Sequence, residues 1–329
     1  MPYTPQQLTV AVSSRALFDL EHEHSLFEEK GFKAFREYQL AHRNVPLKPG
    51  VAFPFVHRLL SLNRLFGADY APFRVIALSR NSPETAARFF FSCRHYDLPI
   101  NAGAFTSGQP TFPYIKPFNI SLFLSANPKS VAKAIAAGLP AGLVLANSAK
   151  NDQDQDPTLR IAFDFDGVLA DDEAEREYQK EGLAAFQRLE IEKAATPHSP
   201  GPLRDLFQKL SSFQRLDAKL HGAMPNFAPA IRISIVTSRG AQSQERLVTT
   251  LKDFGMSAAE LFLLDGLEKT PILEAIRPHI FFDDQVRHLE AVENSIPSVL
   301  VPFGIHNEPQ DNSSREESEN LTTAENSSN

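Results

Sequence analysis

The sequence has little cysteine and no tryptophan. Of its 329 residues, one is cysteine. A single cysteine excludes a disulfide framework within the chain and a zinc site built on cysteines. Cys93 lies in the apolar run "ARFFFSCRHYDL", which favours a small buried hydrophobic residue over a catalytic thiol.

The sequence also lacks a long hydrophobic run. No stretch of about 18 apolar residues occurs, so no membrane-spanning helix is predicted. The first residues, "MPYTPQQLTVAVSSR", lack the charged start and following apolar run of a signal peptide. We therefore expect a soluble, cytoplasmic protein that has no membrane partner.

A surplus of basic residues is absent as well. The formal net charge is -7, and residues 307–329 contain six acidic residues and one arginine. Most of the negative charge therefore lies in this segment, and the rest of the chain is close to neutral. This balance argues against a nucleic-acid partner held by a basic surface. Because 307–329 is nearly devoid of apolar residues, it is predicted to be a disordered acidic tail.

The chain does contain an internal repeat. Residues 11–65 align without a gap on residues 162–216, with eleven identities. Both prolines and the glycine of "PLKPG" at 46 fall on those of "PHSPG" at 197. A repeat of this kind indicates a tandem duplication. With about 150 residues per domain, the length fits two units, at 1–150 and 151–306.

Each copy alternates apolar strand segments with helical segments. With a slightly larger offset, "VIALSR" at 75 is aligned with "SIVTSR" at 234. Strands alternating with helices predict an α/β fold with two doubly wound parallel sheets, whose strands are covered on both faces. The expected strands are 8–14, 73–79, 101–108, 120–126 and 141–146 in the first copy, and 160–166, 231–238, 259–266, 279–284 and 298–303 in the second.

Pairs of carboxylates follow two strands of the second copy. Asp164 and Asp166 end the first strand, in "RIAFDFDGVLADDE", and Asp283 and Asp284 follow "HIFF". Ligands of parallel α/β sheets bind beyond the carboxyl ends of the strands. Carboxylates that converge there repel one another unless a hard cation joins them, and Mg²⁺ prefers oxygen ligands.

Hydroxyl groups and a lysine are expected at the same edge. Thr237 and Ser238 end another strand, and Lys269 lies in the loop after a fourth. A metal ion and a lysine offset phosphate charge, and hydroxyls donate to phosphate oxygens, so the set suits phosphoryl transfer. Because Asp164 and Asp166 are two residues apart on extended backbone, their side chains point the same way. One aspartate can act as the nucleophile and the other can transfer the proton.

The order of these motifs resembles the haloacid-dehalogenase (HAD) phosphohydrolase superfamily. The segments "LFLSAN", "KTPIL" and above all "RPHIFFDDQ" are similar to the cytosolic 5'-nucleotidase type I family. The resemblance covers roughly residues 8–306. It implies two tandem HAD-like units, the first degenerate and the second catalytic, and Mg²⁺-dependent hydrolysis of nucleoside 5'-monophosphates, AMP prominently.

The resemblance also implies roles for the residues. Asp164 would be the nucleophile and a metal ligand, and Asp166 the acid/base, with its backbone carbonyl on the metal. Lys269 would stabilise the phosphoryl group. The remaining implied positions are Thr237 and Ser238 for the phosphate, and Asp283 and Asp284 for Mg²⁺, directly or through water.

The first copy lacks these groups, so it is not expected to run the same reaction. Other residues stand at the matching positions: Ser13, Arg15, Thr111, Ser125 and Ala126. We expect this copy to support the catalytic half and to close part of the substrate pocket. Arg15, Ser79 and Arg80 are candidates for a nucleotide or effector site, and a purely structural role is the alternative.

Two other functions remain open. A phosphatase of the same chemistry could act on a sugar phosphate or another small phosphomonoester, with selectivity set by a small cap within residues 167–230. A nucleotide-binding regulatory protein without turnover is the second alternative. The sequence leaves open the base preference, the effectors, assembly into a homo-oligomer, and which of Asp283 and Asp284 binds the metal directly.

Overall fold

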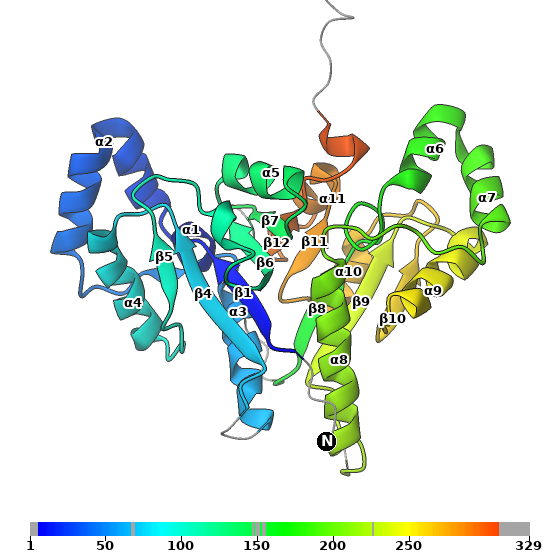
Figure 1. Ribbon diagram of the computed structural model, residues 1–329, viewed down its shortest axis with the longest axis horizontal. Helices are drawn as coiled ribbons and strands as arrows, with labels where there is room; N and C mark the ends of the chain where they lie inside the picture. The colour runs from blue at the N-terminus through cyan, green and yellow to red at the C-terminus, as the bar shows by residue number, and fades with distance from the viewer. Residues whose placement is uncertain are drawn as a thin grey trace, which may run out of the picture.

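The structure is a computed structural model that describes residues 6–66, 70–146, 148, 152, 156–225 and 227–308. It is an α/β fold in which helices flank one large, mostly parallel sheet (Figure 1). The predicted α/β class is therefore confirmed. Of the predicted acidic tail, residues 309–329 lie outside the described part of the chain.

The described part of the chain forms a ten-stranded sheet in the order β10-β9-β8-β11-β12-β7-β6-β1-β4-β5. Neighbouring strands are parallel except at the central pair, β7 and β12. The strands are β1 (Leu8–Val12), β4 (Phe73–Ser79), β5 (Gly103–Phe105), β6 (Ile120–Ser125), β7 (Ala141–Val144), β8 (Leu159–Phe163), β9 (Ile231–Thr237), β10 (Glu260–Leu263), β11 (Phe281–Asp283) and β12 (Ser298–Leu300). A separate antiparallel pair consists of β2 (Phe18–Asp19) and β3 (Lys48–Pro49).

The helices lie between the strands, as the alternating pattern predicts. The α-helices are α1 (Ser14–Leu17), α2 (Glu21–Ala41), α3 (Phe53–Ser61), α4 (Ala86–His95), α5 (Pro128–Ala136), α6 (Glu173–Glu181), α7 (Leu183–Glu192), α8 (Arg204–His221), α9 (Gln244–Asp253), α10 (Thr270–Ile276) and α11 (Val286–Glu290). Short 3₁₀ helices are η1 (Leu62–Leu65), η2 (Pro83–Thr85), η3 (Phe112–Tyr114), η4 (Ala241–Ser243) and η5 (Ile305–Asn307). Figure 1 shows α2 at one end of the molecule and α6 with α7 at the other.

The two halves of the sheet have the same strand order. The first half runs β5-β4-β1-β6-β7 and the second β10-β9-β8-β11-β12, and they join edge to edge through β7 and β12. The two predicted sheets are therefore one continuous sheet.

The strand register corrects one alignment made from the sequence. Phe73 faces Leu8 in the first half, and Ile231 faces Leu159 in the second. With Leu8 equivalent to Leu159, the second strands differ by one residue from the alignment of "VIALSR" with "SIVTSR". Ser79 is thus the counterpart of Thr237, and Arg80 that of Ser238. The alignment of identical residues was wrong by one position. Strand pairing fixes the register, and because side-chain direction alternates along a strand, a shift of one residue changes which side chains face the site.

A glycine with the same backbone conformation occurs in both halves. Gly31 (φ 75°, ψ -178°) breaks α2 into two segments, and Gly182 (φ 81°, ψ -178°) separates α6 from α7. A positive φ of this kind strains any residue with a Cβ. These glycines are 151 positions apart, so both halves place a bent helical segment after their first strand.

One hydrophobic core extends across both halves. The largest cluster of buried side chains contains residues of β1 and β4 together with residues of β8, β9 and α8. The rings of Phe73 and Phe213 lie 4.6 Å apart, and Lys209 Nζ on α8 donates to Ser121 Oγ on β6 at 2.8 Å. Helix α8 of the second half therefore packs against strands of the first.

Cys93 is buried at 1% exposure, and burial raises the pKa of its thiol to about 12, so the prediction of a small buried hydrophobic residue is confirmed. Within the described ranges, no helix combines the length and apolar character that crossing a bilayer requires.

Candidate active site

Three carboxylates meet where β8 and β11 end. Asp164 directly follows β8, Asp283 is the last residue of β11, and Asp284 comes next. These parallel strands are neighbours, and the Asp164 N–H donates to the Phe282 carbonyl at 2.8 Å. All three aspartates are buried, so the carboxylates of 164 and 283–284 lie at one edge of the sheet.

Lys269 joins two of these carboxylates. It precedes α10, and its Nζ lies 3.0 Å from Asp164 Oδ2 and 2.7 Å from Asp283 Oδ2. Burial opposes the charged ammonium, but Asp164 and Asp283 outweigh it and raise the pKa of Lys269. The lysine is therefore a fixed positive charge between two strand ends.

One lysine does not neutralise the whole cluster. Burial, together with Asp283 and Asp166, raises the pKa of Asp164 to about 7 against the opposing effect of Lys269. Burial and the neighbouring carboxylates, Asp164 foremost, raise the pKa of Asp284 to about 10. In Asp283, by contrast, Lys269 and His288 overcome burial and lower the pKa. The site holds more carboxylate than its own cations balance, which is the situation that a bound cation relieves.

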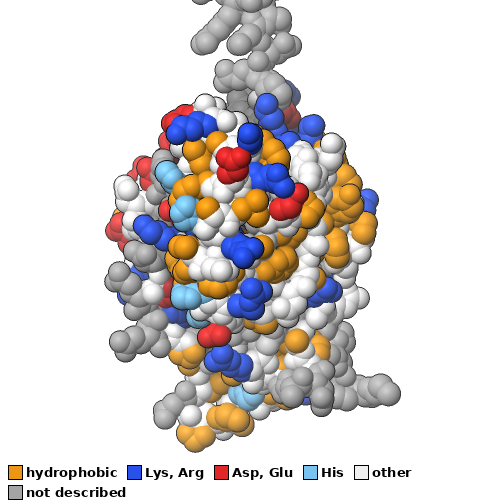
Figure 2. All heavy atoms as spheres, turned by 90° about the vertical axis from the view of Figure 1, so that its left-hand side faces the viewer, with side chains coloured by type: hydrophobic (Ala, Val, Ile, Leu, Met, Phe, Trp, Pro, Cys, Tyr) orange, Lys and Arg blue, Asp and Glu red, His pale blue; other side chains and the backbone are white. Residues whose placement is uncertain are grey.

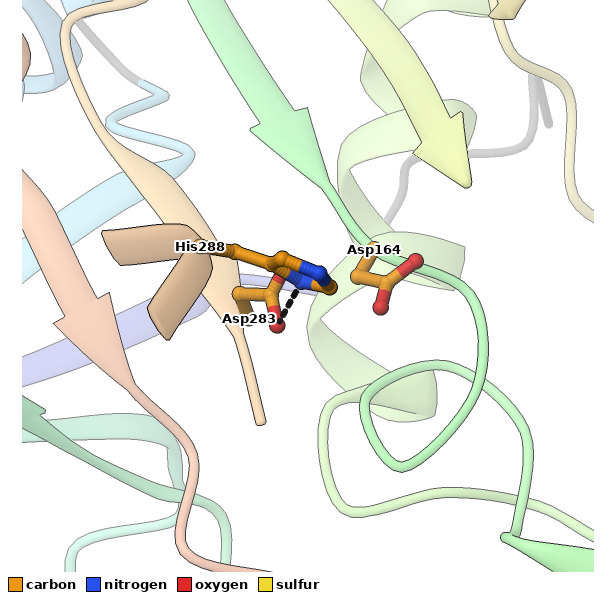
Figure 3. A group of neighbouring side chains, drawn as sticks. All are labelled: Asp164, Asp283 and His288. Carbon is orange, nitrogen blue, oxygen red and sulfur yellow. Dashed lines mark hydrogen bonds and ion pairs between the residues drawn. The ribbon is translucent and has the colours of Figure 1, made fainter. Parts of the chain in front are cut away.

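A candidate metal-binding group is present at this point. Asp164, Asp283 and His288 offer ligand atoms that all lie within 4.8 Å of one another. Figure 3 shows His288 reaching from α11 toward Asp283, with Asp164 beside them. The His288 Nδ1 lies 3.1 Å from Asp283 Oδ2. Sequence reasoning missed His288, although its place in "DDQVRH" puts it one helical turn after the aspartates.

Asp284 supplies a further unused oxygen. Its Oδ1 is buried and has no hydrogen-bond partner among the described residues. Its carboxylate lies against Gly167, where an added Cβ would come 2.6 Å from Asp284 Oδ2. The positive φ of Gly167 (69°) also favours glycine. The loop that carries Asp164 and Asp166 is thus held directly over Asp284.

Asp166 lies at the same edge but faces another cation. Arg239 donates to both of its oxygens, at 2.7 Å from Nε and 2.6 Å from Nη2. Arg239 is buried, and its guanidinium lies 5.1 Å from the Phe165 ring and 5.5 Å from that of Phe186. Sequence reasoning missed Arg239, which directly follows Thr237 and Ser238.

Arg239 belongs to a buried polar network behind the site. Its Nη1 also donates to Glu190 of α7, and Arg246 of α9 donates to the other Glu190 oxygen at 2.8 Å. Burial disfavours ionised Glu190, but a hydrogen bond with His198 and the two arginines lower its pKa to about 2. In the first half, Arg88 likewise donates to Gln39, the counterpart of Glu190, at 3.2 Å. The network fixes α7 and α9 relative to the loop after β9.

The predicted phosphate-binding residues end β9. Thr237 is buried, and its Oγ1 accepts from the Arg239 N–H at 3.3 Å. Ser238 is exposed, and its carbonyl accepts from Gly266 N at 3.0 Å. Because β9 pairs with β8 through Ile235 and Phe163, both residues lie beside the loop of Asp164 and Asp166.

The matching positions of the first half surround a cavity of about 760 Å³. Its lining includes Ser13, Arg15, Ser79, Arg80, Thr111 and Ser125. Ser13 repeats the backbone position of Asp164, since its N–H donates to the Leu124 carbonyl at 2.9 Å. The structure therefore brings together the three residues suggested for a nucleotide or effector site: Arg15, Ser79 and Arg80.

Comparison with known proteins identifies the family. A family model described as 5'-nucleotidase matches residues 1–308. Human "Cytosolic 5'-nucleotidase 1B" is 33% identical over 297 residues, which is 89% of this chain and 48% of the human protein. The chain belongs to the 5'-nucleotidase family. The expectation of a cytosolic 5'-nucleotidase relative, and thus of a family of phosphoric monoester hydrolases, is confirmed. The chain spans about half the length of this human relative.

Two solved structures resemble this member of the 5'-nucleotidase family only weakly. A histidinol dehydrogenase from Elizabethkingia anophelis is 10% identical with a TM-score of 0.23, covering 89% of this chain and 52% of that one. A chain of the Pnkp1/Rnl/Hen1 complex is 12% identical with a TM-score of 0.27, covering 92% and 98%. At these TM-scores, neither supports an inference about the fold.

Proposed function

We propose that this chain hydrolyses nucleoside 5'-monophosphates, AMP among them, to nucleoside and phosphate with the aid of Mg²⁺. One observation carries the proposal beyond family membership. The buried Lys269 lies within 3.0 Å of Asp164 and 2.7 Å of Asp283, so a nucleophile, a cation and a metal-site carboxylate come together from three segments. This is the arrangement that phosphoryl transfer requires.

The residues present suit Mg²⁺. Asp164, Asp283 and Asp284 are hard oxygen ligands, and the unpaired buried Oδ1 of Asp284 is an oxygen that a cation would satisfy. The Asp283 oxygens already accept from Lys269 and Gln285 N–H. We therefore assign direct coordination to Asp284, whose Oδ1 is unpaired. Asp164, which accepts from the Phe165 N–H and lies beside Lys269, is assigned as a ligand because the family resemblance implies it, and Asp283 holds Lys269. When bound, Mg²⁺ supplies positive charge that offsets the phosphate.

The reaction proceeds in two displacements. An Asp164 carboxylate oxygen attacks phosphorus, the bond from phosphorus to the nucleoside oxygen breaks, and Asp166 donates its proton to the leaving alkoxide. Asp166 then takes a proton from water as the water oxygen attacks the aspartyl phosphate, which releases phosphate and restores Asp164. Thr237 and Ser238 donate to phosphate oxygens, and Lys269 offsets their charge.

Arg239 positions Asp166 for these proton transfers. Both oxygens of Asp166 accept from Arg239 in the present arrangement, so one oxygen must be released when Asp166 carries the proton. Glu190 also accepts from Arg239, so the guanidinium keeps a carboxylate partner throughout. We infer that Arg239 holds Asp166 toward the leaving group rather than contacting the phosphate.

An aromatic pair offers a surface for the base. Tyr178 of α6 and Phe186 of α7 lie 6.5 Å apart in an edge-to-face arrangement. Phe186 contacts Arg239, which in turn holds Asp166. Helices α6 and α7 thus serve as the predicted cap, and the planar base of a nucleotide would use these rings where a sugar phosphate would not.

We propose that the second half is the catalytic HAD-like unit and that the first is a degenerate copy. The first half supports it by packing against α8 and by joining through β7 and β12. A cytoplasmic location is proposed too, because the human relative is named cytosolic.

A phosphate-release assay tests the proposal. Ribo- and deoxyribonucleoside 5'-monophosphates and a panel of sugar phosphates are compared with Mg²⁺ and with EDTA. We expect nucleotides to be hydrolysed fastest, no turnover in EDTA, and loss of activity in Asp164→Asn. Faster turnover of sugar phosphates would favour the alternative phosphatase, and absence of turnover on every substrate would favour a binding protein.

A further inference from the structure

The cavity of the first half occupies the place that the active site occupies in the second. It opens at the carboxyl ends of β1, β4 and β6, where Ser13, Ser79 and Ser125 line it. These strands are equivalent to β8, β9 and β11, whose ends carry Asp164, Thr237 and Asp283. At about 760 Å³, the cavity is within the size range of small-molecule sites, roughly 300–1,000 Å³.

The charge of this cavity is reversed relative to the active site. Four carboxylate positions are occupied by Ser13, Arg15, Ser125 and Ala126, so the oxygen ligands of a metal are missing. Arginines enter the lining instead: Arg15, Arg36 and Arg80, against the single acidic lining residue Glu84. Figure 2 shows the outer face of this half, where Lys and Arg side chains are interspersed with hydrophobic and acidic ones.

Arg80 is available to an anion. It is exposed, and its Nε donates to the Gly108 carbonyl at 2.8 Å. No ion pair joins it to an acidic residue of the described chain, whereas Arg15 is paired with Glu21 at 3.0 Å and Arg36 with Glu84 at 3.5 Å. A guanidinium fixed at Nε keeps its outer N–H groups free for phosphate oxygens.

The aromatic pair has been retained. Phe27 and Phe35 line the cavity, and their rings lie 6.0 Å apart at 86°. They are 151 positions before Tyr178 and Phe186, whose rings lie 6.5 Å apart at 85°. The first half has thus lost the carboxylates that catalysis needs and kept the ring surface assigned above to the base.

We propose that this cavity binds a nucleoside 5'-phosphate without a metal ion and without hydrolysing it. The phosphate lies on Arg80 and Arg15 and accepts from the serine hydroxyls, and the base lies against Phe27 and Phe35. The choice of a nucleoside rests on the function proposed for the second half, while the binding of a phosphate by the arginines does not.

Calorimetric titration tests the site. The probe is AMP added to the Asp164→Asn variant of this chain in EDTA, a combination that prevents turnover and removes divalent cations. We expect one binding event under these conditions, with weaker binding of inorganic phosphate and of adenosine. Absence of AMP binding in EDTA would overturn the proposal.

Paired variants locate the binding event. Adding Arg80→Ala should raise the Kd for AMP at least about tenfold. Adding Arg74→Ala, on the same strand but outside the cavity lining, should leave this Kd unchanged. The Phe27 side chain is 44% exposed and therefore tolerant of change. Phe27→Ala should weaken the binding of AMP and leave the binding of inorganic phosphate unaffected. AMP binding that survives both Arg80→Ala and Phe27→Ala would contradict the assignment.

Hydrolysis by the second half and nucleotide binding in the cavity of the first half can be disproved independently. Binding of AMP in EDTA that depends on Arg80, in a protein that hydrolyses no nucleotide with Mg²⁺, would remove the proposed function and keep this site. Hydrolysis of AMP by wild-type protein, without Arg80-dependent binding, would keep the proposed function and remove this site.

Discussion

Arg239 engages both carboxylate oxygens of Asp166, at 2.7 Å and 2.6 Å. The two residues come from the ends of neighbouring strands β9 and β8, and the guanidinium lies 5.1 Å from the Phe165 ring and 5.5 Å from the Phe186 ring. A bidentate pair of this kind fixes direction as well as distance, which the single point charge of lysine does not.

Replacing Arg239 should therefore impair chemistry more than binding. We expect Arg239→Lys to lower kcat by about 10²-fold with little change in KM, because a small misplacement of the proton donor costs that much. Steady-state kinetics on AMP measure both constants. Arg232→Lys is the matched control, since Arg232 is exposed at the start of the same strand and pairs with Glu260. A rise in KM at constant kcat would show that Arg239 binds substrate instead.

Lys269 offers a test of the charge balance at the active site. We expect Lys269→Met to lower kcat by about 10²- to 10³-fold, because a preorganised charge on the phosphoryl group is lost. The variant should also be less stable without metal, since the buried carboxylates of Asp164 and Asp283 lose the ammonium that lies between them. Phosphate release with Mg²⁺ measures kcat, and thermal denaturation in EDTA measures the stability without metal. Lys252→Met, at an exposed position on α9, should change neither.

The metal ligands can be separated by stability measurements. Mg²⁺ that binds the folded chain should raise the Tm in proportion to its affinity. We expect Asp284→Asn to abolish this rise and Asp283→Asn to reduce it, because Asp284 has the unpaired oxygen and Asp283 acts through Lys269. Asp253→Asn, exposed at the end of α9, is the control. A rise that persists in Asp284→Asn but vanishes in Asp283→Asn would reverse the assignment.

Glu190 should make the protein sensitive to acid. Its pKa is about 2 in the folded chain, below the ordinary value of 4.5, so its ionised form stabilises the fold above pH 4.5. That contribution is lost as the pH falls from 4.5 toward 2, and it amounts to about 3 kcal/mol at most. We expect Glu190→Gln to be less stable at pH 7 and to show a shallower decline between these pH values. Urea denaturation at several pH values measures both, and an unchanged slope would contradict the prediction.

Phe186 should contribute to base recognition. We expect Phe186→Ala to raise KM for AMP by about 5- to 150-fold, as the loss of one stacked base contact of about 1–3 kcal/mol implies. Hydrolysis of a phosphomonoester without a base, such as glycerol phosphate, should be affected less. Leu220→Ala, at an exposed position of α8, provides the control for loss of an apolar side chain. An equal loss on both substrates would assign Phe186 to positioning Arg239 alone.

The sequence by itself determined the elements and the residues at their ends. Apolar runs bounded by polar residues predicted each strand of the ten-stranded sheet, because buried parallel strands have no polar face to show. The same pattern placed Asp164, Thr237 and Asp283 at strand ends and Lys269 in the loop after a further strand. Sequence alone also showed that, in the first copy, Ser13 stands at the position of Asp164 and Ser125 at that of Asp283.

Only the tertiary structure decided which of these groups touch. The joining of the halves through β7 and β12, the shift that makes Ser79 equivalent to Thr237, and the contacts of Lys269 with Asp164 and of Arg239 with Asp166 depend on strand register and on packing between distant segments. Local sequence carries the preference for a strand or a helix. It does not determine the pairing of the sheet edges β7 and β12, because the hydrogen bonds between these strands join residues more than a hundred positions apart.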